Sequence, residues 1–380
     1  MDSIWSWETY TLYLFVFVLT IFQLGIISRV NIGININISK PNKYIIKPQL
    51  FIALLPMILM MALRSSTIGQ DLIRYESSYF SFRNIDFSVQ WLIANFSVRE
   101  PFFIILNLVT GLITNWNFQS FIFVTTLIQF FFIYKTLKKL LKKGISPLIP
   151  FGVLSCLIYI RSFSMVRQSI AMSMVVYAYT FLEEKNYKKF WVLSIFAIGI
   201  HYSAIVSVLV YFWSKEHKRQ YITKFLLICA FFVLLTFGNL LIDSLFTFMG
   251  NKYSAIEVNT TFGWGNLLIR LPFVVVIMLY KKEMTRVYPN IKYYISIYYL
   301  DIIVSQLKYF NVQFERISLY TLMSLVFILP VLVKVLRKKF GYVADVIMFF
   351  VLLGYFSYTV YYYSIVSPYH IMPFKFFWDK

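Results

Sequence analysis

Charged side chains are scarce in this chain. Only 14% of its 380 residues are Asp, Glu, Lys or Arg, whereas 59% are apolar, and the mean hydropathy is +0.70. A soluble domain of this size needs about a quarter of its residues charged. The composition therefore excludes two soluble domains and predicts an all-α polytopic integral membrane protein, with residues 1–380 forming a single transmembrane domain.

Cysteine and histidine are also rare. The two cysteines, Cys156 and Cys229, lie inside apolar stretches, so no disulfide framework is implied. Three histidines cannot supply a conventional metal cluster, and neither C-x-x-C nor H-E-x-x-H occurs. No D-x-D pair occurs either, which disfavours a nucleotide-sugar enzyme with a carboxylate-held metal. We therefore expect neither a metal site nor a cofactor.

What the chain does contain is a series of apolar stretches suited to crossing a membrane of about 30 Å as helices. We predict about ten transmembrane helices: Tyr10–Ile27, Ile45–Leu63, Phe118–Tyr134, Pro147–Ile160, Ser169–Leu182, Ile222–Leu240, Trp264–Tyr280, Tyr293–Ser305, Ile317–Val333 and Val343–Tyr363.

Two further apolar stretches fit a single crossing poorly. Phe102–Thr114 would be about 20 Å long as a helix, which is short for a span. Phe190–Trp213 is long enough, but lysine clusters flank both of its ends. If both stretches enter and leave on one side, every lysine cluster falls in the cytoplasm, as the positive-inside rule requires. We therefore predict two re-entrant or interfacial half-helix elements around an outward-facing cavity.

Basic residues differ in type between the two predicted sides. The inner loops hold 24 of the 36 basic residues, and 20 of these are lysine. The net charge of +20 thus serves orientation and contact with anionic membrane lipid, and it does not indicate nucleic-acid binding. The outer side instead favours arginine, whose planar fork grips phosphate oxygens at two points. An outward cavity ringed by arginine predicts an anionic ligand such as a diphosphate, although interfacial snorkelling is the simpler explanation for some of these arginines.

Polar motifs concentrate in a predicted main external loop, residues 64–117, which contains the short helix 102–114. The run Arg64–Glu76 has Gly69 at a point where a tight turn is expected, followed by Asp71 and Tyr75 on one helical face. A capped interfacial helix would explain Asp71 equally well. Glu100 precedes Pro101, so it is either a capping residue or a catalytic one.

Three other motifs lie next to, or inside, apolar stretches. Arg167 and Gln168 open a predicted span, where an arginine opposes the helix dipole and implies a nearby anion. His201 and Tyr202 interrupt Phe190–Trp213 at a depth where an ionisable group is costly and usually functional, or else hydrogen-bonded in the core. The remaining pair is Arg316 and Tyr320, which share one helical face.

These segments, in this order, resemble the EpsG-like branch of the Wzy-type polysaccharide polymerases. The matching pieces are R-S-S-T-I-G-Q-D-L-I-R-Y, R-E-P-F-F-I-I-L-N, S-M-V-R-Q-S-I-A-M, G-I-H-Y-S-A and R-I-S-L-Y before a final proline-tyrosine. The resemblance implies a membrane glycosyltransferase that joins undecaprenyl-diphosphate-linked repeat units of a capsule, exopolysaccharide or O-antigen on the outer face of the bacterial cytoplasmic membrane. A flippase and a chain-length regulator of the same pathway would be partners.

The resemblance assigns Arg64, Asp71, Arg167, His201 and Arg316 to the polymerase site, and the chemistry of a lipid-diphosphate substrate suggests the following roles. Arg64, Arg167 and Arg316 would bind the substrate diphosphate, with Arg64 also orienting the loop that carries Asp71. The base that accepts the acceptor's proton would be Asp71, Glu100 or His201, and the sequence does not distinguish them. The supporting residues would be Gly69, Tyr75, Gln168, Tyr202 and Tyr320. A flippase for lipid-linked sugars and a glycan ligase remain alternatives, the first disfavoured by the lack of a visible inverted repeat.

Overall fold

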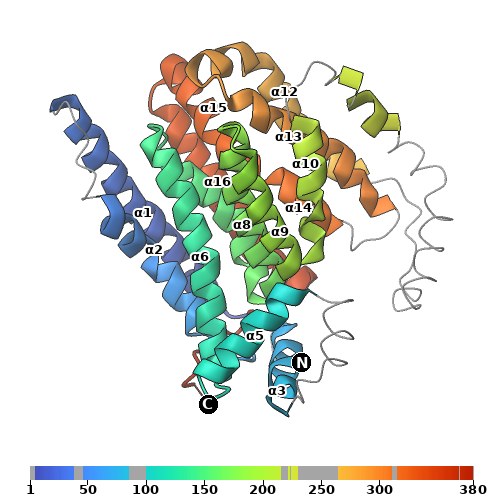
Figure 1. Ribbon diagram of the computed structural model, residues 1–380. Helices are drawn as coiled ribbons and strands as arrows, with labels where there is room; N and C mark the ends of the chain where they lie inside the picture. The colour runs from blue at the N-terminus through green and yellow to red at the C-terminus, as the bar shows by residue number, and fades with distance from the viewer. Residues whose placement is uncertain are drawn as a thin grey trace. The chain divides into compact units, whose positions relative to one another are not determined.

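Every regular element in the described part of the chain is a helix (Figure 1). The computed structural model describes residues 5–37, 46–84, 100–214, 221–222, 224–229, 264–309, 315–367 and 369–379. Within these ranges, β-type pairing is confined to one isolated antiparallel bridge between Arg64 and Phe376. The predicted all-α class is therefore confirmed.

Several of these helices are long and apolar enough to cross a membrane. In the described ranges there are five, at Trp7–Ser28, Phe118–Lys142, Trp264–Val287, Arg316–Phe340 and Val343–Val366. Shorter apolar helices lie at Pro48–Ala62, Pro101–Ile113, Leu148–Tyr159 and Tyr202–Ser214. The chain is thus a helical membrane protein, but the predicted total of about ten spans is not confirmed.

The contacts divide the chain into two units. Unit 1 comprises residues 1–204 and 336–380, and it carries most of the predicted site. Its helices are α1 (Trp7–Asn37), α2 (Ile46–Ala62), α3 (Leu72–Ser81), η1 (Phe82–Asn84), α5 (Pro101–Ile113), α6 (Phe118–Lys142), α7 (Leu148–Leu154), the π-helix η2 (Ser155–Tyr159), η3 (Arg161–Phe163), α8 (Val166–Glu183), α9 (Tyr187–Ile200), α16 (Val343–Tyr361) and the π-helix η7 (Tyr362–Val366).

Unit 2 comprises residues 205–335. The 3-10 turn η4 (Tyr202–Ile205) leads into it, and its helices are α10 (Val206–Ser214), α12 (Trp264–Val287), α13 (Ile291–Val304), η5 (Ser305–Tyr309), α14 (Glu315–Leu322) and α15 (Leu325–Phe340), the last continuing into unit 1. Most of the predicted span Ile222–Leu240 lies outside the described residues, as does Arg99.

The two apolar stretches that fit a single membrane crossing poorly both form short helices. Phe102–Thr114 corresponds to α5, which has 13 residues. Phe190–Trp213 is interrupted, because α9 ends at Ile200 and His201 takes an extended conformation with φ −156° and ψ 117°. The helix break at His201 is present, whereas the re-entrant or interfacial placement of the two elements stays a prediction.

Helix α8 is buried along almost its whole length and packs against α6 and α9. The small side chains Ser169, Ala171 and Ser173 are all buried, which lets neighbouring helices approach closely. Two ion pairs join the C-terminal ends of α6 and α8, Lys139 with Glu184 at 2.7 Å and Lys143 with Glu183 at 2.8 Å. Since α8 begins at Val166, this helix separates Arg167 at one end from the ion pairs at the other.

The C-terminal segment 369–379 holds the loop that follows α2. The backbone N–H groups of Gly69 and Gln70 donate to the carbonyls of His370 and Tyr369, at 3.1 and 2.8 Å. Ser65 N–H donates to the Lys375 carbonyl at 2.9 Å. These bonds satisfy backbone groups of an irregular loop at the end of the apolar helix α2 and fix the position of residues 64–71.

Candidate functional site

Glu100 lies at the centre of a cluster of charged side chains in unit 1. Its Oε2 accepts a hydrogen bond from Arg167 Nη1 at 2.5 Å, and its Oε1 is hydrogen-bonded to Nδ1 of His201. The Glu100 side chain is only 4% exposed, whereas those of Arg167 and His201 are 41% and 20% exposed. Residues from three separate sequence motifs therefore meet at one buried carboxylate, while the side chains of Arg167 and His201 stay partly open to solvent.

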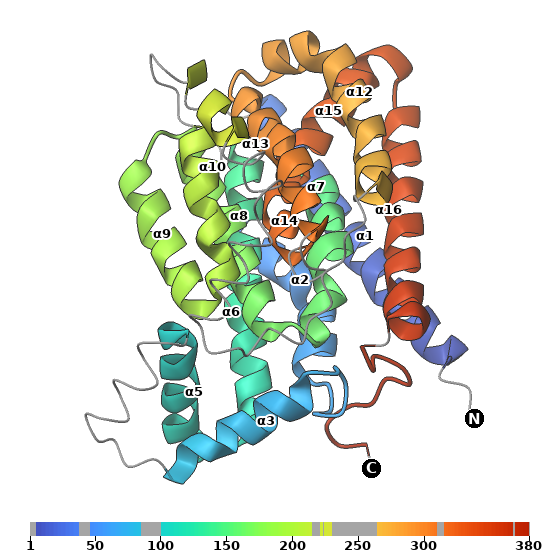
Figure 2. The ribbon, with the colours of Figure 1, turned by 90° about the vertical axis from the view of Figure 1, so that its right-hand side faces the viewer.

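Two local features deliver Glu100 and His201 to the same place. Pro101 occupies the start of α5, and the Glu100 side chain before it makes no capping hydrogen bond to that helix. A Cβ at Gly199 would lie 2.1 Å from Cδ2 of Phe102, so only glycine lets α9 approach α5 this closely. Figure 2 shows α5 beside the end of α9, where His201 follows.

Aromatic rings hold the Arg167 guanidinium. Its Nε donates to the Tyr75 hydroxyl at 3.3 Å, and its Cζ lies 5.4 and 5.5 Å from the ring centres of Tyr75 and Phe103. Cation–π contacts of this kind stabilise a partly desolvated charge. The anion expected near an arginine at a helix N-terminus is present, and it is Glu100 of the protein itself.

Asp71 lies one helical turn before Tyr75. Its Oδ2 accepts from Ser164 Oγ at 3.1 Å, and its backbone N–H donates to the same hydroxyl at 3.2 Å. The loop before it needs Gly69, which has φ +119° and where a Cβ would lie 1.9 Å from the Phe163 carbonyl oxygen. The predicted tight turn is thus present, and it presses the Asp71 loop against the segment that leads into α8.

Electrostatics fix the protonation of the Glu100–His201 contact. Burial by itself would raise the pKa of Glu100, but the hydrogen bond and charge of His201, followed by the charge of Arg167, outweigh burial and hold this pKa below its usual value. An ionised carboxylate only accepts hydrogen bonds, so His201 Nδ1 carries the proton in this contact. When the imidazole is neutral, Nε2 is then the ring nitrogen able to take a proton from a substrate.

Arg64 lies away from the charged cluster. Its side chain has no exposed surface, its Nη1 donates to the Met61 carbonyl at 2.7 Å, and its guanidinium lies 5.0 Å from the ring centre of Phe163. Burial lowers the pKa of Arg64 to about 10, which leaves it protonated at neutral pH. In this conformation a diphosphate cannot reach Arg64, and its contacts suit the other role expected of it, orienting the loop.

The remaining predicted residues divide between the two units. Gln168 is buried in α8, and Tyr202 is half exposed and stacks on His201 with ring centres 5.4 Å apart. Arg316 and Tyr320 lie in α14 of unit 2, the first partly exposed and the second fully buried. Unit 1 therefore brings together Asp71, Tyr75, Glu100, Arg167, His201 and Tyr202.

Sequence reasoning missed two supporting residues and one buried network. Ser164 and Phe103 stood inside the quoted motifs, but serine and phenylalanine are too common to single out. In unit 2, Arg270 Nε donates to Asp301 at 2.6 Å, and Thr321 donates to the same carboxylate at 2.6 Å. A lone aspartate within the apolar span Tyr293–Ser305 was the signal that could have found this network.

In the part of the chain that the structure describes, no three His, Cys, Asp or Glu side chains come together to form a metal site. The ionisable groups of the cluster instead bond to one another. Their arrangement can bind an anion at Arg167 and exchange a proton at His201.

A family model of the EpsG family matches residues 47–376, which covers all of the cluster. The chain belongs to the EpsG family. Membership points to a membrane glycosyltransferase-like polysaccharide polymerase. No curated protein and no solved structure matches the chain.

Proposed function

We propose that this EpsG-family protein joins undecaprenyl-diphosphate-linked oligosaccharide repeat units on the outer face of the bacterial cytoplasmic membrane. The Glu100-centred cluster carries the proposal. It combines a partly exposed guanidinium with an imidazole that has one nitrogen available, within a family of polymerases. These are the groups that glycosyl transfer from a lipid diphosphate needs.

Arg167 would stabilise the leaving group. When the bond between the anomeric carbon and the diphosphate oxygen breaks, the electron pair stays with that oxygen, and negative charge develops on the diphosphate. A preorganised cation next to it lowers the barrier without a metal ion. Arg167 is suited to this role because Tyr75 and Phe103 fix its plane while 41% of its side chain stays exposed.

His201 is our candidate for the base. Its Nε2 would take the proton of the acceptor hydroxyl as that oxygen forms the new bond to the anomeric carbon. Glu100 would orient the imidazole and stabilise its positive charge, in the manner of the acid residue of a hydrolase triad. Glu100 itself is a poor base, because Arg167 and His201 occupy its two oxygens.

Asp71 and Arg316 complete the proposal. Asp71 is 32% exposed and lies one turn from Tyr75, where it could bind sugar hydroxyls or assist the acceptor. Arg64, Gly69 and the C-terminal segment would hold its loop. Arg316 is proposed as a second diphosphate ligand on sequence grounds alone.

The direct test uses purified protein in lipid vesicles with the lipid-linked repeat unit, read by the ladder of products on a gel. We expect a ladder without added metal and in the presence of EDTA. A reaction that EDTA abolishes and magnesium or manganese restores would contradict the metal-free scheme. A single transfer to another acceptor, without a ladder, would favour the glycan ligase.

Two cell experiments test the location. Cells lacking the protein should display single repeat units outside but no long chains; repeat units held only on the inner leaflet would favour a flippase. In a Cys156→Ser/Cys229→Ser background, Asp71→Cys should react with an impermeant thiol reagent from outside and Lys188→Cys should not. The reverse pattern would contradict the proposed orientation.

A further inference from the structure

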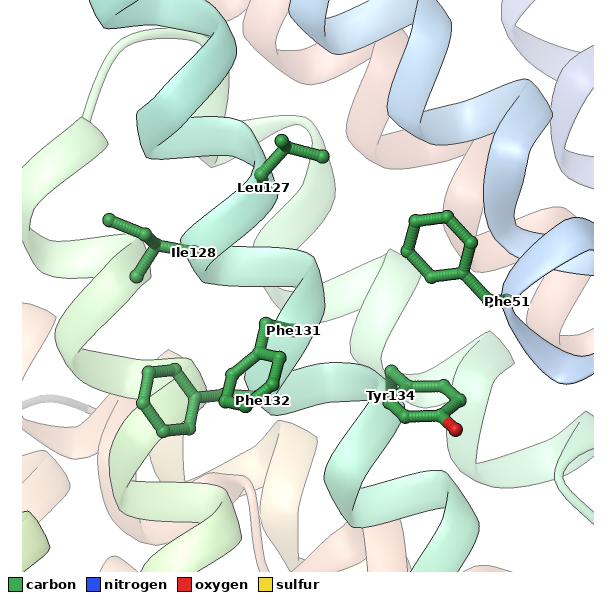
Figure 3. Close-up of a pocket in the computed structure, with 6 residues that line it drawn as sticks. All are labelled: Phe51, Leu127, Ile128, Phe131, Phe132 and Tyr134. Carbon is green, nitrogen blue, oxygen red and sulfur yellow. The ribbon is translucent and has the colours of Figure 1, made fainter. Parts of the chain in front are cut away.

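An apolar groove of about 710 Å³ runs along α6 on unit 1 (Figure 3). Phe51 of α2 forms one wall, with its ring centre 6.3 Å from that of Tyr134. The rest of its lining comes from side chains on successive turns of α6, namely Leu127, Ile128, Phe131, Phe132 and Tyr134. On a membrane helix, such a groove is suited to a hydrocarbon chain.

Two lysines lie at one end of this groove. The Nζ of Lys135 lies 4.9 Å from the ring centre of Phe131, and that of Lys138 lies 5.4 Å from the ring centre of Tyr134. The ammonium groups thus sit on the same two rings that form the groove wall. A hydrocarbon chain in the groove would place a polar headgroup beside them.

Neither lysine is neutralised by a carboxylate among the residues that the structure describes. The acidic residues Glu184 and Glu183 instead pair with Lys139 and Lys143, at 2.7 and 2.8 Å respectively. The groove therefore combines an apolar wall with two positive charges that lack an ionic partner in the described ranges. A basic pocket between membrane helices is a typical binding site for an anionic lipid headgroup.

The groove is distinct from the Glu100-centred cluster. The N-terminal end of α6 borders the cluster, since Phe121 contacts Phe103 with ring centres 6.0 Å apart. Tyr134 lies 13 residues further along the helix, which corresponds to about 20 Å. The headgroup of a lipid in the groove would therefore lie about 20 Å along α6 from the residues that border the proposed reaction.

We propose that this groove binds one anionic glycerophospholipid, with an acyl chain along α6 and the phosphate between Lys135 and Lys138. The inference goes beyond the proposed function and does not depend on it. The charge of the lysines favours a headgroup with net negative charge over a zwitterionic one, and the apolar wall favours a ligand with a hydrocarbon chain over a free phosphate.

The test is native mass spectrometry of the full-length protein in detergent, titrated with phosphatidylglycerol or with phosphatidylcholine of the same acyl chains. We expect one phosphatidylglycerol to bind more tightly than phosphatidylcholine. Lys135→Ala/Lys138→Ala should weaken phosphatidylglycerol binding about 25-fold, since each lysine beside a phosphate contributes about a fivefold factor. The control Lys338→Ala/Lys339→Ala removes the same charge from exposed residues at the end of α15 and should leave the affinity unchanged.

A second variant tests the apolar part of the site. Ile128→Trp should fill the groove and weaken phosphatidylglycerol binding with both lysines present. Equal losses in the two lysine variants, equal affinity for the two lipids, or unchanged binding in Ile128→Trp would overturn the proposal. Displacement of phosphatidylglycerol by an equal concentration of farnesyl diphosphate would assign the groove to prenyl diphosphates instead and overturn it as well.

Discussion

Glu100 and His201 are hydrogen-bonded although 101 positions separate them in the sequence. The contact joins the residue that precedes α5 to the residue at which α9 ends. Arg167 reaches the other oxygen of the same carboxylate from α8. One carboxylate thus orients a candidate base and a candidate leaving-group ligand together, so the two halves of the proposed reaction should respond to changes at Glu100.

A double-mutant cycle tests whether Glu100 and His201 act as a unit. His201→Ala should reduce polymerisation about a hundredfold to ten-thousandfold, the usual contribution of a general base. Glu100→Gln should also reduce polymerisation strongly, but less than His201→Ala does. The imidazole keeps a hydrogen-bond partner in the glutamine amide but loses the negative charge that compensates its own positive charge. In the double variant the loss should be far smaller than the product of the two single losses, since residues that act as a unit are not additive. The rate of ladder formation measures the loss in each variant. A loss in the double variant equal to the product of the two single losses would mean that the two residues act independently.

Arg167→Lys tests the forked donor. Lysine keeps the positive charge, and therefore insertion into the membrane, but it cannot reach Glu100, Tyr75 and a phosphate together. We expect polymerisation to fall about a hundredfold to a thousandfold, as when a preorganised donor to a developing anion is removed. The matched control is Arg83→Lys at an exposed position in η1, which should retain activity. Full activity in Arg167→Lys would contradict the assigned role.

The sequence predicted the polar residues of the cluster but not their pairing. Glu100, Arg167 and His201 were identifiable because each is a polar residue where an apolar helix begins or breaks, which is costly without a function. Their meeting at Glu100 depends on the packing of α5, α8 and α9, which no local pattern encodes. Arg64 illustrates the same limit. An arginine that follows an apolar span can either face water or pack its guanidinium against buried aromatic rings, and the local sequence does not distinguish these two arrangements.

The division of the fold shows a similar limit. The apolar stretches predicted most of the helices, including α5, α13 and α16 within a few residues, although α12 continues to Val287, beyond its predicted end at Tyr280. The number of membrane-spanning helices could not be predicted in the same way, because helices such as α2 and α7 are shorter than a typical span. The grouping of residues 336–380 with the N-terminal half rests on backbone hydrogen bonds such as that between Gly69 and His370, to which side-chain patterns give no signal.

Glu100 should make the stability of the protein depend on pH in the acid range. Its pKa in the folded state is lowered from about 4.5, so its ionised form stabilises the fold above that pH. This stabilisation should be lost as the pH falls through the lower folded-state pKa. Thermal unfolding in detergent from pH 6 to pH 3 should therefore lose more stability in the wild type than in Glu100→Gln. Parallel curves for the two proteins would contradict the lowered pKa.

Gly69→Ala tests the turn that carries Asp71. A Cβ at this position would overlap the Phe163 carbonyl oxygen at 1.9 Å, so the backbone would have to move. The control is Gly144→Ala, where φ is also positive (+71°) but nothing lies within 4 Å of the added Cβ. The control should lose only the roughly 1–2 kcal/mol of a left-handed alanine, while Gly69→Ala should lose more and also lose polymerisation. Equal unfolding temperatures for the two variants would show that the close contact is unimportant.

The buried pair Arg270–Asp301 should be far more sensitive than an exposed pair of the same type. Asp301→Ala leaves a buried guanidinium without its carboxylate and should lower the free energy of unfolding by about 3–5 kcal/mol. The double variant Arg270→Met/Asp301→Leu should lower it by less, because no charge remains buried. Asp345→Ala, which breaks the more exposed pair with Arg337, should cost less than about 1 kcal/mol. Unfolding temperatures in detergent provide the comparison. Two outcomes would contradict a charge-based role for the network that joins α12, α13 and α14. One is that Asp345→Ala is as damaging as Asp301→Ala, and the other is that the double variant is worse than Asp301→Ala.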